Sequence, residues 1–70
     1  MFAIEWLRTG SVVERETSVL KTEGEVIVRA RARAHEVAAR LPGREPDSFR
    51  LKDASGKELG VHSLSSIPGP

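Results

Sequence analysis

Two histidines, one serine and two aspartates are the residues best suited to catalysis or metal binding, but their spacing argues against both. His35 and His62 lie far apart in the sequence, and neither has an acidic pair at metal-ligand spacing beside it. His62 precedes Ser63, but adjacent strand residues point to opposite faces, whereas a Ser–His pair must converge. Asp47 and Asp53 show no paired-carboxylate pattern for acid–base work. We therefore expect no catalytic residue, no metal site, no cofactor and no enzymatic activity.

The most distinctive charged pattern is a set of three arginines in a net basic segment flanked by net acidic ones. On a helical wheel Arg29, Arg33 and Arg40 lie within about 40° of one another. Arginine forks match phosphate geometry, so this stripe is a candidate anion or nucleic-acid surface. The alternative is a solvated helix face on which Glu25 pairs with Arg29 and Glu36 pairs with Arg40. The segment has no aromatic residue to stack bases, and the pI of 8.3 is low for a nucleic-acid-binding domain, which favours the alternative.

Trp6 is the only tryptophan in the chain. It shares one face of an alternating segment with Phe2 and Ile4, which favours a position in the core. An exposed Trp6 would instead anchor a contact with another protein, because tryptophan is enriched in interface hot spots. Trp6 is therefore the candidate residue of an interaction surface.

The length of 70 residues allows one small domain. The absence of cysteine excludes disulfides and thiolate sites. No apolar run approaches the roughly 20 residues of a membrane-spanning helix, and the N-terminus lacks a charged-then-apolar leader pattern, so we expect a cytoplasmic protein without a membrane contact. The stability of a domain with so small a core is marginal unless disulfides, a metal or a partner subunit support it. A homodimer is one expected form of this support.

Two alternating segments predict an N-terminal hairpin. In residues 2–8, Phe2, Ile4 and Trp6 share one face and the intervening residues share the other, which is typical of a half-buried strand. A Thr-Gly-Ser turn follows. Residues 12–20 predict a weaker second strand, and its charged residues suit the edge of a sheet.

Residues 22–41 predict the single helix. Thr22 and Glu25 form the Thr-x-x-Glu pattern of a capping box, and a Pro-Gly pair follows the last helical residue. The strict Arg/Ala alternation of residues 29–34 also fits a strand, but that strand would bury bare alanines of poor strand propensity. In a helix the apolar residues fall within an arc of about 120°: Val26, Ile27, Ala30, Ala34, Val37, Ala38 and Leu41.

Residues 48–53 and 57–64 predict a second hairpin around a turn that ends in glycine. In this hairpin Leu59 and Val61 are expected to face the core. The predicted order is ββαββ and the fold class is α+β. Because one amphipathic helix must bury its stripe on a sheet, we expect it to pack on four antiparallel strands.

The predicted domain comprises residues 1–64, and residues 65–70 are expected to be a flexible C-terminal tail. Across residues 2–64 the chain resembles short uncharacterised bacterial proteins of ββαββ order. The alternating residues 30–34 carry this resemblance, together with the strand–turn–strand pattern of residues 49–59. It implies the fold and no activity, because those proteins have no assigned function.

The sequence therefore predicts a small bacterial-type domain that acts as a protein-interaction module, with an unknown protein partner or a second copy. The contact would use a sheet face or edge around Trp6 or residues 12–20. The alternative is a weak nucleic-acid or anion binder that uses Arg29, Arg33 and Arg40, whose affinity would fall steeply with salt.

Overall fold

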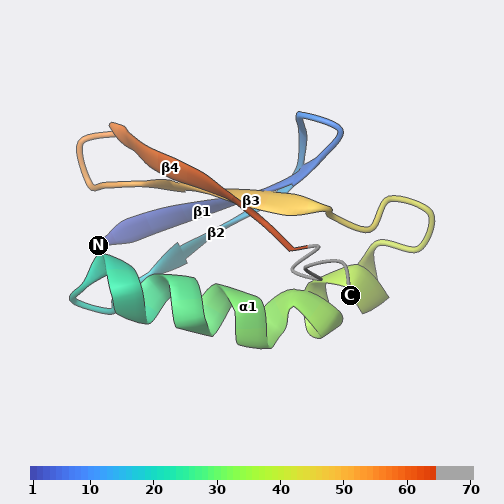
Figure 1. The fold of residues 1–70 in the computed structure, drawn as a ribbon, viewed down its shortest axis with the longest axis horizontal. Coiled ribbons are helices and arrows are strands. Elements are labelled where there is room, and N and C mark those ends of the chain that lie inside the picture. Colours follow the sequence, from blue (N-terminus) through green and yellow to red (C-terminus); the bar gives the residue numbers. More distant parts are fainter. Residues whose placement is uncertain (65–70) are drawn as a thin grey trace, which may run out of the picture.

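The computed structural model describes residues 1–64 and confirms the α+β class and the ββαββ order (Figure 1). The flexible tail predicted for residues 65–70 lies outside the described residues. The elements are β1 (Phe2–Arg8), β2 (Ser11–Ser18), α1 (Glu23–Arg40), β3 (Ser48–Lys52) and β4 (Glu58–Ser63).

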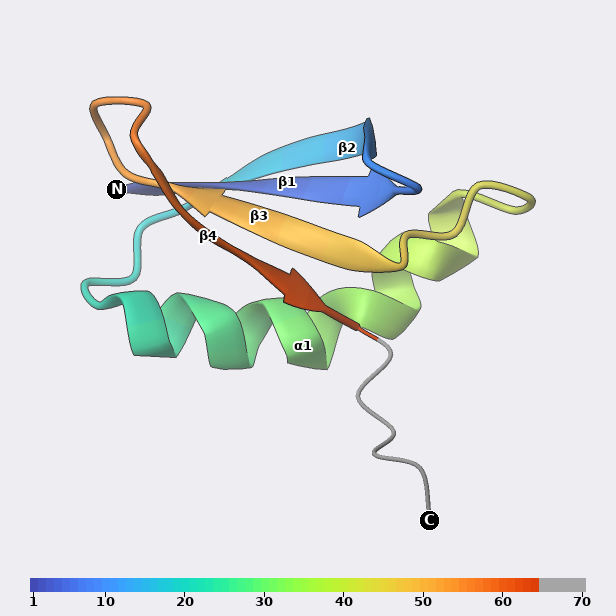
Figure 2. The same ribbon diagram turned by 45° about the horizontal axis from the view of Figure 1, so that its top comes forward.

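The strands form one antiparallel sheet in the order β2-β1-β3-β4. The predicted edge position of β2 is confirmed, and β1 lies between β2 and β3. The connection from β2 to β3 passes through α1, which covers one face of the sheet and leaves the other face open (Figures 1 and 2). The fold therefore has two layers, with one flank of the helix beside the edge strand β2.

The helix begins and ends at the residues that the capping signals predict. The Thr22 hydroxyl accepts from the Glu25 backbone N at 3.2 Å, while Glu25 Oε1 accepts from the Thr22 backbone N at 3.2 Å. At the other end, the Leu41 backbone N donates to the Ala38 carbonyl at 3.1 Å. The predicted limits of 22–41 are thus the two cap residues. No helix among residues 1–64 is long and apolar enough to cross a membrane.

The core lies between α1 and the sheet and contains the large aromatic side chains. Trp6 and Phe49 are fully buried, and their ring centroids lie 5.6 Å apart at an interplanar angle of 51°. This tilted contact is a favourable aromatic geometry. The apolar arc of the helix supplies the opposite side of the core, as predicted. The core cluster comprises Ile4, Trp6, Val26, Ala30, Val37, Leu41, Phe49 and Leu51.

The orientation predicted for β4 is wrong from Val61 onward. Leu51 pairs with Gly60 and the next pair is Lys52 with Glu58, so Leu59 is an extra residue that breaks the alternation. Leu59 still packs against the core, but Val61 is 52% exposed on the open face. Gly60 has a φ of +155°, a conformation that suits glycine at this irregularity.

Candidate interaction surface

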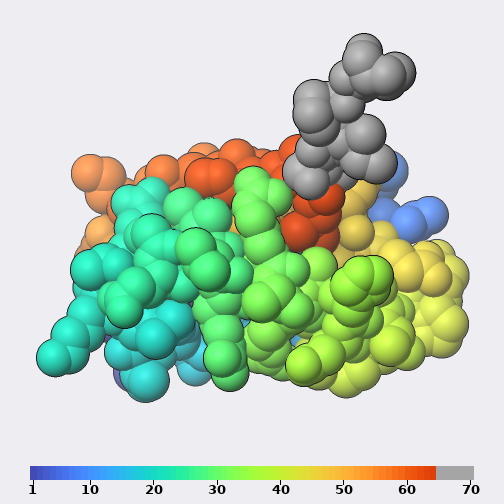
Figure 3. Space-filling model, turned by 60° about the horizontal axis from the view of Figure 1, so that its bottom comes forward, coloured from blue at the N-terminus to red at the C-terminus, as the bar shows by residue number. Residues whose placement is uncertain are grey.

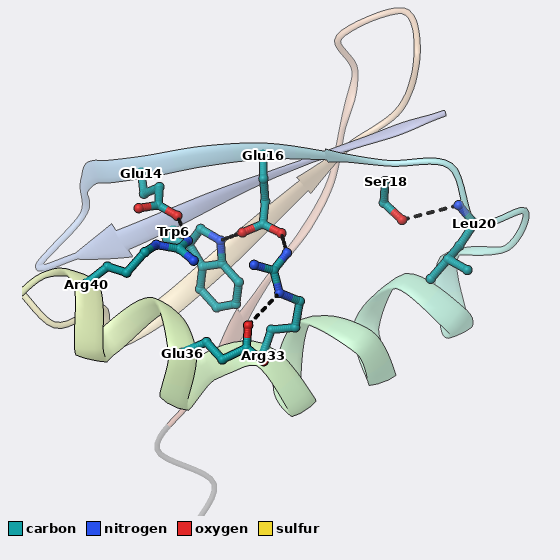
Figure 4. Close-up of polar contacts among 8 residues, drawn as sticks. All are labelled: Trp6, Glu14, Glu16, Ser18, Leu20, Arg33, Glu36 and Arg40. Carbon is teal, nitrogen blue, oxygen red and sulfur yellow. Dashed lines mark hydrogen bonds and ion pairs between the residues drawn. The ribbon is translucent and has the colours of Figure 1, made fainter.

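The predicted arginine stripe faces the edge strand β2, where acidic side chains neutralise most of it (Figure 4). Arg33 donates to Glu16, and Arg40 donates to Glu14. Arg33 Nε also lies 3.6 Å from Glu36 Oε2. The predicted Glu36–Arg40 pair is therefore replaced by contacts between the helix and the sheet. Two of the three candidate anion-binding arginines hold α1 against β2.

Trp6 lies beneath this layer of ion pairs and has no exposed surface. Its indole Nε1 donates to Glu16 Oε2 at 2.9 Å (Figure 4). Phe2, Ile4 and Trp6 all belong to the side of the sheet that packs on α1. The interpretation of Trp6 as a core residue fits this position. The alternative, in which an exposed Trp6 anchors a partner, does not.

Arg29, the third arginine of the stripe, has a different setting. Its predicted partner Glu25 belongs to the capping box, where Glu25 Oε1 accepts from both the backbone N and the hydroxyl of Thr22. Within residues 1–64 Arg29 makes no ion pair, and its side chain lines two adjoining hollows beside α1. Arg29 is therefore the arginine of the stripe that can pair with a charged ligand.

The first of these hollows is an apolar groove along the first half of α1. Val28 is 69% exposed there. Leu20 enters the groove from the segment between β2 and α1, and its backbone N donates to Ser18 Oγ at 3.3 Å (Figure 4). Figure 3 shows this segment and the first half of α1, coloured cyan to green, side by side on the surface. Four residues form the apolar groove, with Glu25 and Arg29 also lining it: Leu20, Gly24, Val28 and Ala32.

The second hollow lies between the end of β2 and α1, and Leu20 and Arg29 line it as well. Val19, which also lines it, is 82% exposed. Two of the four large exposed apolar residues within 1–64, Val19 and Val28, thus line these adjoining hollows, while Val61 lies on the open sheet face.

A second charged cluster lies on the open face of the sheet around Glu5, which is only 4% exposed. Glu5 accepts from Arg15 Nε at 3.0 Å and from Arg50 Nε at 2.7 Å, and Lys52 Nζ lies 3.5 Å away. Burial acts to raise the pKa of the Glu5 carboxyl, but the two hydrogen bonds and the charges of Lys52 and Arg50 outweigh it and hold that pKa below its ordinary value. This cluster was not predicted from the sequence, although the outward position that these residues share in their alternating strands was the available signal.

The remaining candidate residues hold turns and packing contacts. Asp47 accepts from the Thr9 backbone N at 3.0 Å, and this bond, with a second from Ser48, lowers the pKa of Asp47. Asp53 caps the turn after β3, where the side-chain hydrogen bond from Ser55 lowers its pKa most. His35 is exposed on α1. Residues 1–64 contain no group of His, Cys, Asp or Glu side chains that could hold a metal ion.

The predicted alternation of β4 required His62 to point away from the core, but in the structure it points toward the core. The irregularity at Leu59 turns His62 toward Phe49, and the two rings stack with centroids 5.3 Å apart. Its Nε2 is buried, and the structure contains no hydrogen-bond partner for it within residues 1–64. His62 therefore serves as part of the aromatic packing.

Comparison with known proteins assigns no family to the chain. No protein-family model, curated protein or solved structure matches it. The resemblance to short bacterial ββαββ proteins therefore stays a prediction.

Proposed function

We propose that the chain is a protein-interaction module whose partner docks on the apolar groove beside α1. The observation that carries this proposal is that each of the two adjoining hollows exposes a valine: Val28 is 69% exposed in the groove, and Val19 is 82% exposed in the second hollow. Exposed apolar side chains that gather in one place mark interaction sites more often than scattered ones do. Covering a valine side chain contributes about 1.5–3 kcal/mol, so two or three such residues can support a specific contact.

Arg29 defines the chemistry of the partner. It lines both hollows and makes no ion pair within residues 1–64. A carboxylate brought to this position would form a charge-assisted hydrogen bond with the guanidinium. The proposed partner therefore presents an apolar side chain next to an acidic one.

Anilinonaphthalene sulfonate tests the groove directly, because it joins an apolar ring system to one anionic group. At low protein concentration we expect it to shift the backbone amide resonances of residues 19–32. Val28→Glu should weaken binding by about tenfold or more, since it places a charge in the groove. Val61→Glu is the matched control, because Val61 is an exposed valine on the open face. Equal losses in the two variants, or shifts confined to the open face, would contradict the proposal.

A second candidate function is anion or nucleic-acid binding, and one observation favours it. Three cations, Arg15, Arg50 and Lys52, surround the carboxylate of Glu5 on the open sheet face, and Arg50 also pairs with Glu58, which leaves one more positive than negative charge. Arg33 is unsuitable for a test, because it holds Glu16 and its replacement would disturb the fold. This candidate requires a duplex oligonucleotide to shift in a gel at low salt, with the shift lost in Arg15→Glu and at high salt. An unshifted oligonucleotide at low salt contradicts it.

A further inference from the structure

We infer that the partner on the apolar groove is the same groove of a second copy of this chain. In the resulting dimer two α1 helices pack antiparallel across a two-fold axis near Val28. The inference rests on the proposed function and names its partner. A two-fold contact requires a surface that is complementary to itself in shape and in charge.

The spacing of side chains along α1 meets the requirement of shape. Gly24 and Ala32 each lie four residues from Val28, one turn before it and one turn after it, on the same exposed face. In the antiparallel pair Gly24 therefore faces the partner's Ala32, and Ala32 faces the partner's Gly24. A Cβ built on Gly24 meets no atom within 4 Å, so the space above it is open to a second helix. The small residues on either side let Val28 of each copy seat against the other helix.

The charges beside the groove are also complementary to themselves. Glu25 and Arg29 lie on the same flank of α1, and both line the groove. In the antiparallel pair, Glu25 of one helix and Arg29 of the other are offset by about 3 Å along the helix axis. This offset is within the reach of their side chains. The cap uses only Oε1 of Glu25, so Oε2 is available to the partner's Arg29. Two equivalent ion pairs would then flank the apolar contact.

Leu20 completes the contact from outside the helix. Leu20 also lines the groove, so the partner's Val28 would meet apolar atoms from Leu20 as well as from α1. The six residues that line the groove are far fewer than the roughly 20–30 residues a side of a stable interface, and we therefore expect a reversible association in the micromolar to millimolar range. Such a dimer gives a small, cysteine-free domain additional apolar burial that does not depend on a disulfide.

Sedimentation over a wide range of protein concentrations tests the inference. We expect the wild-type chain to shift from monomer to dimer as its concentration rises. Val28→Glu should weaken this association by about tenfold or more, whereas Val61→Glu should leave it unchanged. A dimer that Val28→Glu does not weaken would overturn the inference, because it would use another surface such as the edge of β2.

Two charge reversals make the test specific to the two-fold arrangement. Glu25→Lys and Arg29→Glu each create two repulsive contacts in their own homodimers, so each variant alone should be monomeric where the wild type dimerises. Because Glu25→Lys also removes the cap acceptor of Thr22, circular dichroism must show that this variant keeps the helix content of the wild type. A mixture of the two variants has attractive contacts at both positions, and we expect it to form a heterodimer. If the mixture stays monomeric while wild type dimerises, the pairing is wrong. If wild type stays monomeric although the groove binds anilinonaphthalene sulfonate, the second copy is excluded and the interaction module remains.

Discussion

Trp6→Ala is expected to lower the free energy of unfolding by about 4 kcal/mol, because it empties the largest site in a small core. Trp6 is fully buried, lies 5.6 Å from the Phe49 ring and donates to Glu16. A domain of 70 residues is stable by only about 4–10 kcal/mol, so the substitution should remove between about two fifths and all of the free energy of unfolding. Urea unfolding followed by far-ultraviolet circular dichroism measures the loss, since the variant has no tryptophan.

A second variant separates the packing of Trp6 from its hydrogen bond. Trp6→Phe keeps an aromatic ring but removes the Nε1 donor, while Glu16 retains Arg33. We therefore expect a smaller loss of about 1–2 kcal/mol. Trp6→Ala costing less than Trp6→Phe, or below about 1 kcal/mol, would be inconsistent with a core position.

The elements of this fold could be predicted because each carries its own local signal. The capping box of Thr22 and Glu25 and the Pro-Gly pair after Leu41 determine both ends of the helix without reference to the rest of the chain. Alternation likewise locates β1 and β3. A single helical stripe then requires one sheet face to bury it, and from this the two-layer architecture follows.

Side-chain orientation in β4 could not be predicted from alternation. Parity carries along a strand only while every residue has one partner, and Leu59 has none. One extra residue was enough to exchange the predicted positions of Val61 and His62. A glycine at position 60 is the available signal, because an isolated glycine in a strand often accompanies a bulge.

The candidate site depended on the topology more than on any local pattern. Local spacing predicted ion pairs within the helix, for example between Glu36 and Arg40. The sheet order instead brings Glu14 and Glu16 of the edge strand beside the same flank of α1, and the arginines pair across the two layers. Once this pairing is known, Arg29 is identified as the arginine of the stripe that makes no ion pair within residues 1–64.

Glu5→Gln is expected to destabilise the fold by about 1.5–3 kcal/mol, because it removes the charge from the carboxylate that accepts two charge-assisted hydrogen bonds. Glu5 accepts from Arg15 and Arg50, and Lys52 lies 3.5 Å away. Glu58→Gln is the matched control: Glu58 also pairs with Arg50, but at 3.7 Å and with a side chain that is 54% exposed. An exposed pair of this kind contributes little, so the control should cost less than about 0.5 kcal/mol.

The pH dependence of the same variant gives an independent test of Glu5. Its folded pKa lies below the ordinary value of 4.5, so the unfolded chain binds more protons between the two values. The stabilisation by Glu5 is therefore fully present above about pH 5.5 and is lost as the pH falls through 4.5 toward the folded pKa. Asp47 and Asp53 also have lowered pKa values, so the wild type and Glu58→Gln should both lose stability in this window. Glu5→Gln should lose less than either, because its site no longer titrates. Equal slopes in all three proteins would show that the buried carboxylate does not carry the charge network of the open face.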